Sequence, residues 1–371
     1  ARFGTNIKTW RLFADGVNDL GITLELLAPL YPRRFLAIIC LASVFKAMCG
    51  VAAGATNAAI TEHWALRNNI ADIGAKTGAQ HTVVTLAGLL LGIWFARFAN
   101  ASAGGVWASY SVLTALHLFA NYRAMRTLAL RSLNPARLSM LSGAFIRALA
   151  ARDARDDFPP GSALAGAETG VGSGADSSGS GDGANDSGVQ SGAEGALSLQ
   201  LVAAREPLLW LPGWAARLWP WGDALQQVKM GVALSEMCEE ADDLLWLAGL
   251  YHTHRAAVGV RLVGFQALGP RLDTAVAVAL REDATSEDQA GLARAFFQAC
   301  LVHHCLAESP SDIPDDPLHR KLFLRAVVEG SLRVTEEEFP AFWRRLAASG
   351  WDLGRVTLGP PRWLCRWGNA A

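Results

Sequence analysis

Five polar side chains that could do chemistry lie close together in the sequence, between two long apolar stretches. They are Asn68, Asn69, Asp72, Lys76 and Gln80. Asp72 and Lys76 are four residues apart with the acid first, so on a helix they would share one face and favour an ion pair. Beside lipid, an unpaired charge is costly, which makes pairing close to obligatory. Two interpretations stay open: a structural clasp that closes a helical hairpin, or a polar pocket for a ligand or ion.

Histidines and cysteines occur in the chain, but their spacing matches no standard metal-binding pattern. His63 and His81 flank the polar segment, each nine residues from Asp72. Cys300 and His304 would share one helix face. We therefore predict capping or packing roles for these side chains, with no metal site and no cofactor. The same interpretation applies to the remaining candidates of this kind, His252, His254, His303 and Cys305.

Catalytic sequence motifs are also missing. The chain contains no GxSxG, no HExxH and no Gly-rich dinucleotide fingerprint, which are the short motifs that carry recognisable chemistry. We therefore predict that the protein is not an enzyme. The net charge of -1 provides no global basic field, so nucleic acid is not expected as a partner.

Three stretches around the polar segment are nearly free of charge. Lys46 is the only charged residue in 35–61, and none occurs in 77–96 or 98–122. A membrane-spanning helix needs about 20 mostly apolar residues, so we expect candidate membrane helices near 35–60, 82–98 and 100–122. A buried helical core is the alternative. Hydrophobic residues make up 51% of the chain, which is apolar for a soluble protein.

The rest of the chain differs in amino-acid composition from this apolar region. Residues 159–199 are rich in Gly, Ser and Asp and poor in aromatic residues, so they should form a disordered linker. Beyond it, the Val-rich runs 257–266 and 274–281 predict strands.

Two pairs with capping-box spacing predict helix starts in the C-terminal region. The first pair is Ser286 with Gln289, and the second is Thr335 with Glu338. Together these patterns predict a mainly α protein. A helical, membrane-associated N-terminal domain (1–150) would be followed by a small α+β domain (200–371).

Several segments resemble the root UVB sensitive family. They are KTWRLFADGVND (8–19), ELLAP (25–29), VAAGATNAAITEHWALRNNIADIGAKTGAQ (51–80), NYRAMRTLALRSLNPARL (121–138) and the C-terminal GWDLGRVTL (350–358). The resemblance implies a eukaryotic, largely helical, membrane-associated protein. Plant members are linked to seedling development, ultraviolet-B responses in roots, plastids and auxin transport, and some members to pyridoxal-phosphate homeostasis. Plant members associate with one another through the shared domain, and no catalytic residue comes with the family.

Three function hypotheses follow from the residues and the resemblance. The leading one is a membrane-associated scaffold, in a plastid or another organelle, whose partner is a second copy or another family member. The alternative is a small-molecule carrier with its polar site at 68–80. A weaker alternative is an enzyme that holds a pyridoxal-type cofactor through Lys76.

Overall fold

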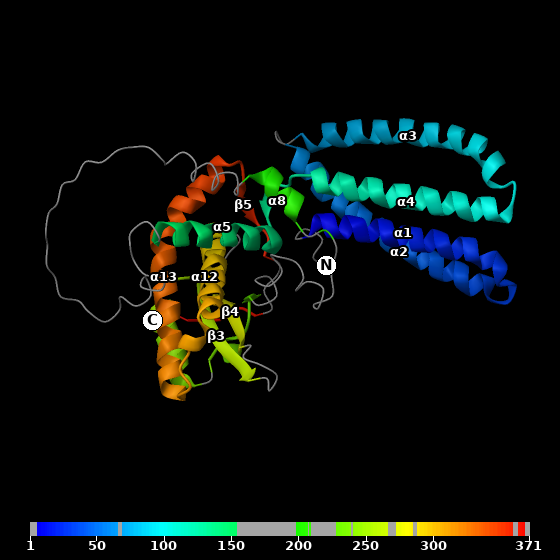
Figure 1. Cartoon of the computed structure of the whole chain (residues 1–371). Coiled ribbons are helices and arrows are strands. Elements are labelled where there is room, and N and C mark those ends of the chain that lie inside the picture. The colour runs from blue at the N-terminus through cyan, green and yellow to red at the C-terminus, as the bar shows by residue number, and fades with distance from the viewer. Residues whose placement is uncertain are drawn as a thin grey trace. The chain divides into compact units, whose positions relative to one another are not determined.

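The chain folds into two compact units. In this computed structural model, the described residues are 6–65, 69–153, 198–206, 208, 228–238, 240–265, 272–284, 288–358 and 363–367. The first unit comprises Ala1–Leu130 with Glu206–Trp210, and the second comprises Arg131–Arg205 with Leu211–Ala371 (Figure 1). The predicted linker 159–199 lies outside the described residues, apart from its last two positions.

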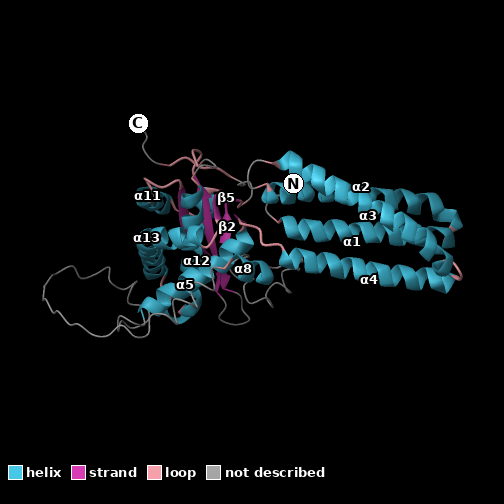
Figure 2. Cartoon of the chain, turned by 90° about the horizontal axis from the view of Figure 1, so that it is seen from above, coloured by secondary structure: helices cyan, strands magenta, loops and turns pink. Residues whose placement is uncertain are grey.

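The first unit consists of helices that run side by side (Figures 1 and 2). They are α1 (Ile7–Leu27), α2 (Phe35–Trp64), α3 (Ile70–Ala99) and α4 (Ala103–Thr127), with the short 3-10 turns η1 (Ala28–Leu30) and η2 (Pro32–Arg34) after α1. Ser102 caps α4 by accepting a hydrogen bond from the Gly105 amide at 3.0 Å, which satisfies one of the unpaired donors of the first turn.

Helix α1 lies against α2 and α4. Gly21 lets α1 and α2 approach closely, because a Cβ at this position would lie 3.2 Å from the Ala42 carbonyl oxygen and from Lys46 Cγ. Residues 70–80 of the polar segment are the first turns of α3, which continues without a break into the apolar stretch. Asn69 lies directly before this helix.

This unit exposes many large apolar side chains and buries several polar ones. Its buried polar side chains include Lys8, Asp15, Asp19 and Thr56. Large apolar side chains are exposed on α2, α3 and α4, and α3 has no buried residue at all. On α3 the exposed set is Ile70, Val83, Val84, Leu86, Leu89, Leu90, Leu91, Ile93, Trp94, Phe95 and Phe98.

The second unit combines helices with two small sheets. Its helices are α5 (Pro135–Asp153), α8 (Leu199–Arg205), α11 (Ala241–Leu250), α12 (Gln289–Glu308) and α13 (Pro317–Ala348), with the 3-10 turns η3 (Leu234–Glu236) and η4 (Pro310–Asp312). One sheet has the order β2 (Val228–Met230), β4 (Leu272–Leu280), β3 (Ala256–Phe265), in which β2 is parallel and β3 antiparallel to β4. The other pairs β1 (Ser132–Leu133) with β5 (Asp352–Val356) in parallel.

The core of the second unit forms around α12, which contacts α5, α13 and the three-stranded sheet (Figure 2). Phe145 of α5, Phe297 of α12 and Phe342 of α13 meet there, with ring centroids 5.1–5.6 Å apart. Edge-on aromatic pairs of this kind add to the burial of their large apolar area. The mainly helical fold with strands in the C-terminal region confirms the predicted fold class.

The predicted second capping box is wrong. Thr335 lies inside α13, where its buried hydroxyl donates to the Ser331 carbonyl, one turn earlier. The helix begins instead after Asp316, whose carboxylate accepts from the His319 amide at 3.0 Å, with Pro317 in the first turn. A Thr followed three residues later by Glu also occurs inside helices, so the spacing alone does not mark a start. For α12, Ser286 lies outside the described residues, and Asp288 is the cap.

Candidate functional site

The structure spreads the predicted site residues along one helix. Asn68 lies outside the described residues. Asn69 precedes α3, and its buried Oδ1 atom has no hydrogen-bond partner. Asp72, Lys76 and Gln80 are exposed on α3, and within the described chain Asp72 and Lys76 form no ion pair with each other. Whether these residues form a clasp or a pocket stays a prediction.

A second group of polar residues, which the sequence analysis did not single out, lies between α1 and α4. We call it the polar seam: Arg11, Asp15 and Asp19 of α1 with Tyr110 and His117 of α4. His117 Nδ1 lies 3.2 Å from both carboxylate oxygens of Asp19. Because a carboxylate only accepts hydrogen bonds, Nδ1 carries the proton in this contact. The Tyr110 hydroxyl donates to the Asp19 carbonyl at 2.9 Å and thereby ties the two helices together.

Asp15 is the member of the polar seam whose carboxylate lacks hydrogen-bond partners among the described residues. About nine tenths of its side chain is buried, and Oδ2 has no hydrogen-bond partner. Its other oxygen, Oδ1, is 3.9 Å from Arg11 Nε. Desolvation raises the pKa of Asp15 above its ordinary value and Asp19 raises it further, while Arg11 and His117 act in the opposite direction. Burial without enough partners therefore favours the neutral acid.

A buried ion pair ties the start of α1 to the segment after α8. Lys8 Nζ lies 2.9 Å from Glu206 Oε2, and the two side chains are only 2% and 5% exposed. Arg126 Nη1 donates to the Glu206 carbonyl at 3.3 Å. Leu208 packs beside this pair with Ile7 and with the end of α4. Glu206 and Leu208 therefore belong to the helical unit, although they follow a helix of the second unit.

The second unit contains a groove between α11, β3 and the first half of α13. Its cavity volume is about 330 Å³, which lies within the size range of small-molecule sites. The groove has an apolar floor formed by Met237, Cys238, Leu247, Gly259, Val260, Leu324 and Val328. A Cβ on Gly259 would lie 2.7 Å from Met237 Cε, so a larger residue there would displace the flexible end of that methionine side chain.

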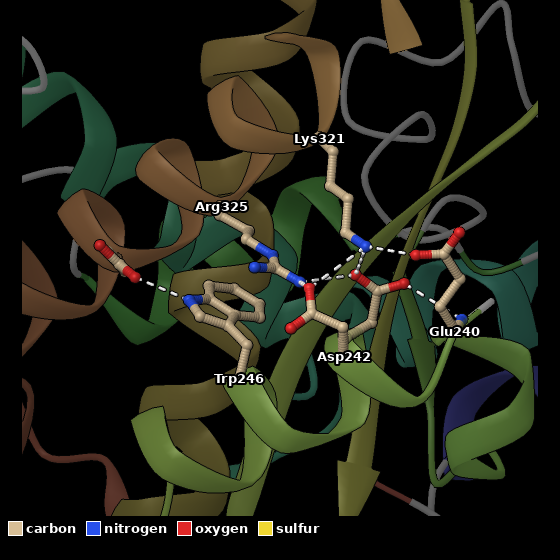
Figure 3. Close-up of polar contacts among 7 residues, drawn as sticks. Glu240, Asp242, Trp246, Lys321 and Arg325 are labelled. Carbon is tan, nitrogen blue, oxygen red and sulfur yellow. Dashed lines mark hydrogen bonds and ion pairs between the residues drawn. The ribbon is translucent and has the colours of Figure 1, made fainter. Parts of the chain in front are cut away.

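Charged side chains line the rim of this groove (Figure 3). Lys321 Nζ is 2.7 Å from Glu240 Oε2 and 3.0 Å from Asp243 Oδ1. Arg325 Nη2 bonds to Asp242 at 2.6 Å and to Asp243 at 2.9 Å.

The Arg325 guanidinium also lies over the Trp246 ring, 5.1 Å from its centroid, in a cation–π arrangement. The Trp246 indole donates in turn to Glu329 Oε1 at 2.7 Å. The hydrogen bond from Arg325 is the main cause that lowers the pKa of Asp242. The rim therefore carries charges of both signs.

One signal for the polar seam was available in the sequence. Asp15 and Asp19 are four residues apart in the 8–19 segment, a spacing that places both acids on one helix face. Their partner His117 is 98 residues further along the chain, and only the packing of α1 on α4 brings it close. No comparable local signal exists for Lys8 and Glu206.

Comparison with known proteins identifies two family domains. A family described as vitamin B6 photo-protection and homoeostasis domain matches residues 1–148. A second family, described as root UVB sensitive protein, C-terminal, matches residues 197–367. No solved structure matches the chain.

Curated relatives align with about two fifths of the chain. Protein root UVB sensitive 3 of Arabidopsis thaliana is 48% identical over 143 residues, which cover 38% of this chain and 32% of the relative. RUS family member 1 of Dictyostelium discoideum is 40% identical over 144 residues, 38% of this chain and 27% of the relative. Root UVB sensitive 2, chloroplastic, of Arabidopsis thaliana is 35% identical over 147 residues, which cover 40% of this chain and 34% of the relative.

The chain thus spans about a third of the length of these relatives. The two domain matches together account for most of its own length, in the order that the sequence motifs predicted. On this evidence the chain belongs to the root UVB sensitive family.

Proposed function

We propose that this protein is a membrane-embedded scaffold. Its helical unit would lie in lipid, and its C-terminal unit would bind a second copy of the chain or another member of the family. The observation that carries the proposal is the surface of the helical unit, which exposes many large apolar side chains while several polar ones are buried. Lipid is a solvent in which such a surface is stable, whereas soluble proteins rarely expose large apolar patches.

Helix length supports this proposal. Two described helices, Pro32–Trp64 and Ile70–Ala99, are long and apolar enough to cross a membrane by length and composition. The 30 residues of α3 span about 45 Å at 1.5 Å per residue, which exceeds a hydrocarbon core of about 30 Å. Helix α4, which contains the third expected span, does not meet the same criteria of length and composition.

The groove in the C-terminal unit supports the interaction part of the proposal. Exposed leucines occur on both helices that border it, Leu244 and Leu245 on α11 and Leu318 and Leu322 on α13. The rim charges of both signs would let the same surface pair with itself, as a two-fold symmetric contact between copies requires. The family descriptions favour a role in ultraviolet-B response or vitamin B6 homoeostasis, and one relative's name suggests a plastid membrane.

Carbonate washing of membranes that contain the full-length protein tests the embedded state. We expect the protein to stay in the pellet. Leu90→Arg places a charge in the exposed apolar part of α3 and should cost about 2.5–3.5 kcal/mol of insertion free energy, so this variant should move toward the supernatant. Leu245→Arg alters an equally exposed leucine of the other unit and should stay in the pellet. Release of the unmodified protein would reject embedding.

Co-purification of two differently tagged copies from detergent tests self-association. Leu245→Arg should weaken co-purification, because it places a charge in the exposed apolar surface of α11. Leu90→Arg should leave co-purification unchanged. Failure of the unmodified copies to associate, with each other or with a co-expressed family member, would reject the scaffold.

A small-molecule carrier is the second candidate function. The polar seam favours it, because buried acids among apolar helices are common in transport pathways. Labelled pyridoxine is a suitable probe, given the description of the matching family. If the segment 68–80 lines the path, Asp72→Asn and Lys76→Met should each abolish uptake into reconstituted vesicles. Arg97→Gln, at the other end of α3, is the control. Normal uptake by both of the first two variants would reject that site.

A further inference from the structure

We infer that the polar seam is a proton-binding site, in which Asp15 takes up and releases one proton and Asp19 with His117 connects it to the surface. The inference rests on contacts within the helical unit. It does not depend on self-association, and it uses residues other than those of the 68–80 segment.

The first argument is the state of the Asp15 carboxyl group. Its side chain is about nine tenths buried and Oδ2 has no partner. An ionised carboxylate in such a place has lost its water without gaining donors, which costs far more than burying the neutral acid. Binding a proton removes the charge, and no other part of the structure has to move.

The second argument is the balance of charges around Asp15. On its own helix, Arg11 favours the carboxylate and Asp19 opposes it. From α4, His117 favours the carboxylate. From α2, Cys49 interacts with both acids.

Lys46, also on α2, is engaged by Glu25, 2.6 Å from its Oε2. Desolvation outweighs the favourable charges, so the pKa of Asp15 is raised. The site is therefore poised to change its protonation state at a higher pH than an ordinary aspartate does.

The third argument is a connection to the surface. Asp15 and Asp19 are one helical turn apart, with about 5–6 Å between Cβ atoms for this spacing. His117 Nδ1 is 3.2 Å from Asp19, and the His117 side chain is 41% exposed. Where water reaches His117 Nε2, a proton bound there lets the Nδ1 proton move to Asp19. Rotation of the two carboxyl groups then passes one proton to Asp15, and Asp19 returns to carboxylate.

Infrared spectroscopy of the full-length protein in detergent micelles tests the site. Near pH 6, an aspartate with an ordinary pKa is only about 1% protonated, so a carboxylic-acid carbonyl band there reports a raised group. We expect this band in the unmodified protein and its loss in Asp15→Asn. Asp15→Glu, which keeps a carboxyl, should retain a band. Asp283→Asn is the matched control, because Arg281 lowers the pKa of that exposed acid, and the band should persist.

The connection is tested by the rate at which the band forms after a pH jump. His117→Gln should slow its formation by about tenfold or more and leave its final intensity unchanged. An unchanged rate would overturn the role of His117. Absence of the band in the unmodified protein, or its persistence in a folded Asp15→Asn variant, would overturn the proton site. Loss of the band on adding sodium at constant pH would assign the site to a cation and overturn it equally.

Discussion

Breaking the buried Lys8–Glu206 ion pair should strongly destabilise the helical unit. The two charged atoms are 2.9 Å apart and the side chains are almost fully buried. At this distance and an effective dielectric constant of about 20, the attraction is about 6 kcal/mol. Removing two ions from water costs several kcal/mol each, so the intact pair contributes little net stability. A variant that lacks one of the two residues still bears the desolvation cost of the other residue but loses the attraction between them.

We therefore expect Lys8→Met and Glu206→Leu each to cost about 3–5 kcal/mol. The double variant should lie much closer to the unmodified protein than the sum of the two, because it removes both buried charges of the pair together. Lys46→Met is the control. It breaks the contact with Glu25, which is shorter at 2.6 Å but has both side chains more than one third exposed, so it should cost at most about 1 kcal/mol.

Hydrogen–deuterium exchange of α1 peptides in micelles measures the opening free energy of this unit alone. A global probe would mix the two units, whose unfolding need not be one transition. The reasoning is refuted if each single change costs less than 1 kcal/mol, or if the double variant loses as much as the two single variants together.

Three further outcomes are expected. Gln298→Leu removes the amide that donates to the buried Tyr251 hydroxyl at 2.6 Å and should cost about 1–3 kcal/mol, seen as a lower thermal midpoint of the C-terminal unit; no change would show that the hydroxyl finds another partner. Because the pKa of Asp15 is raised in the folded state, folding binds a proton, and the stability of the helical unit should fall as pH rises above the unfolded value of 3.8 toward the folded one. Exchange of α1 peptides across a pH series should show this decline, and a decline of equal size in Asp15→Asn would contradict the assignment. Arg325→Lys keeps the charge but loses the planar fork and the stacking over Trp246, so exchange in α11 should accelerate; unchanged exchange would mean that the charge alone suffices.

Much of the architecture could be predicted from local sequence patterns. The Val-rich runs 257–266 and 274–281 correspond to β3 and β4 within two residues at either end, because alternation and β-branched residues act over a few neighbours. The three apolar stretches lie largely within α2, α3 and α4, and their lengths of about 20 residues had favoured helices. Thr335 shows the limit of such patterns, since the same spacing that caps one helix lies inside another.

The polar contacts depend on packing between distant segments. Asp72 and Lys76 had the spacing for an ion pair, yet they are exposed on a helix with no buried residue. Asp15 and Asp19 had the same spacing but lie on the face of α1 that meets other helices. The local sequence therefore determines which residues share a helix face. Only the tertiary fold decides which face is desolvated and what lies opposite, because desolvation and long-range pairing depend on every neighbouring element.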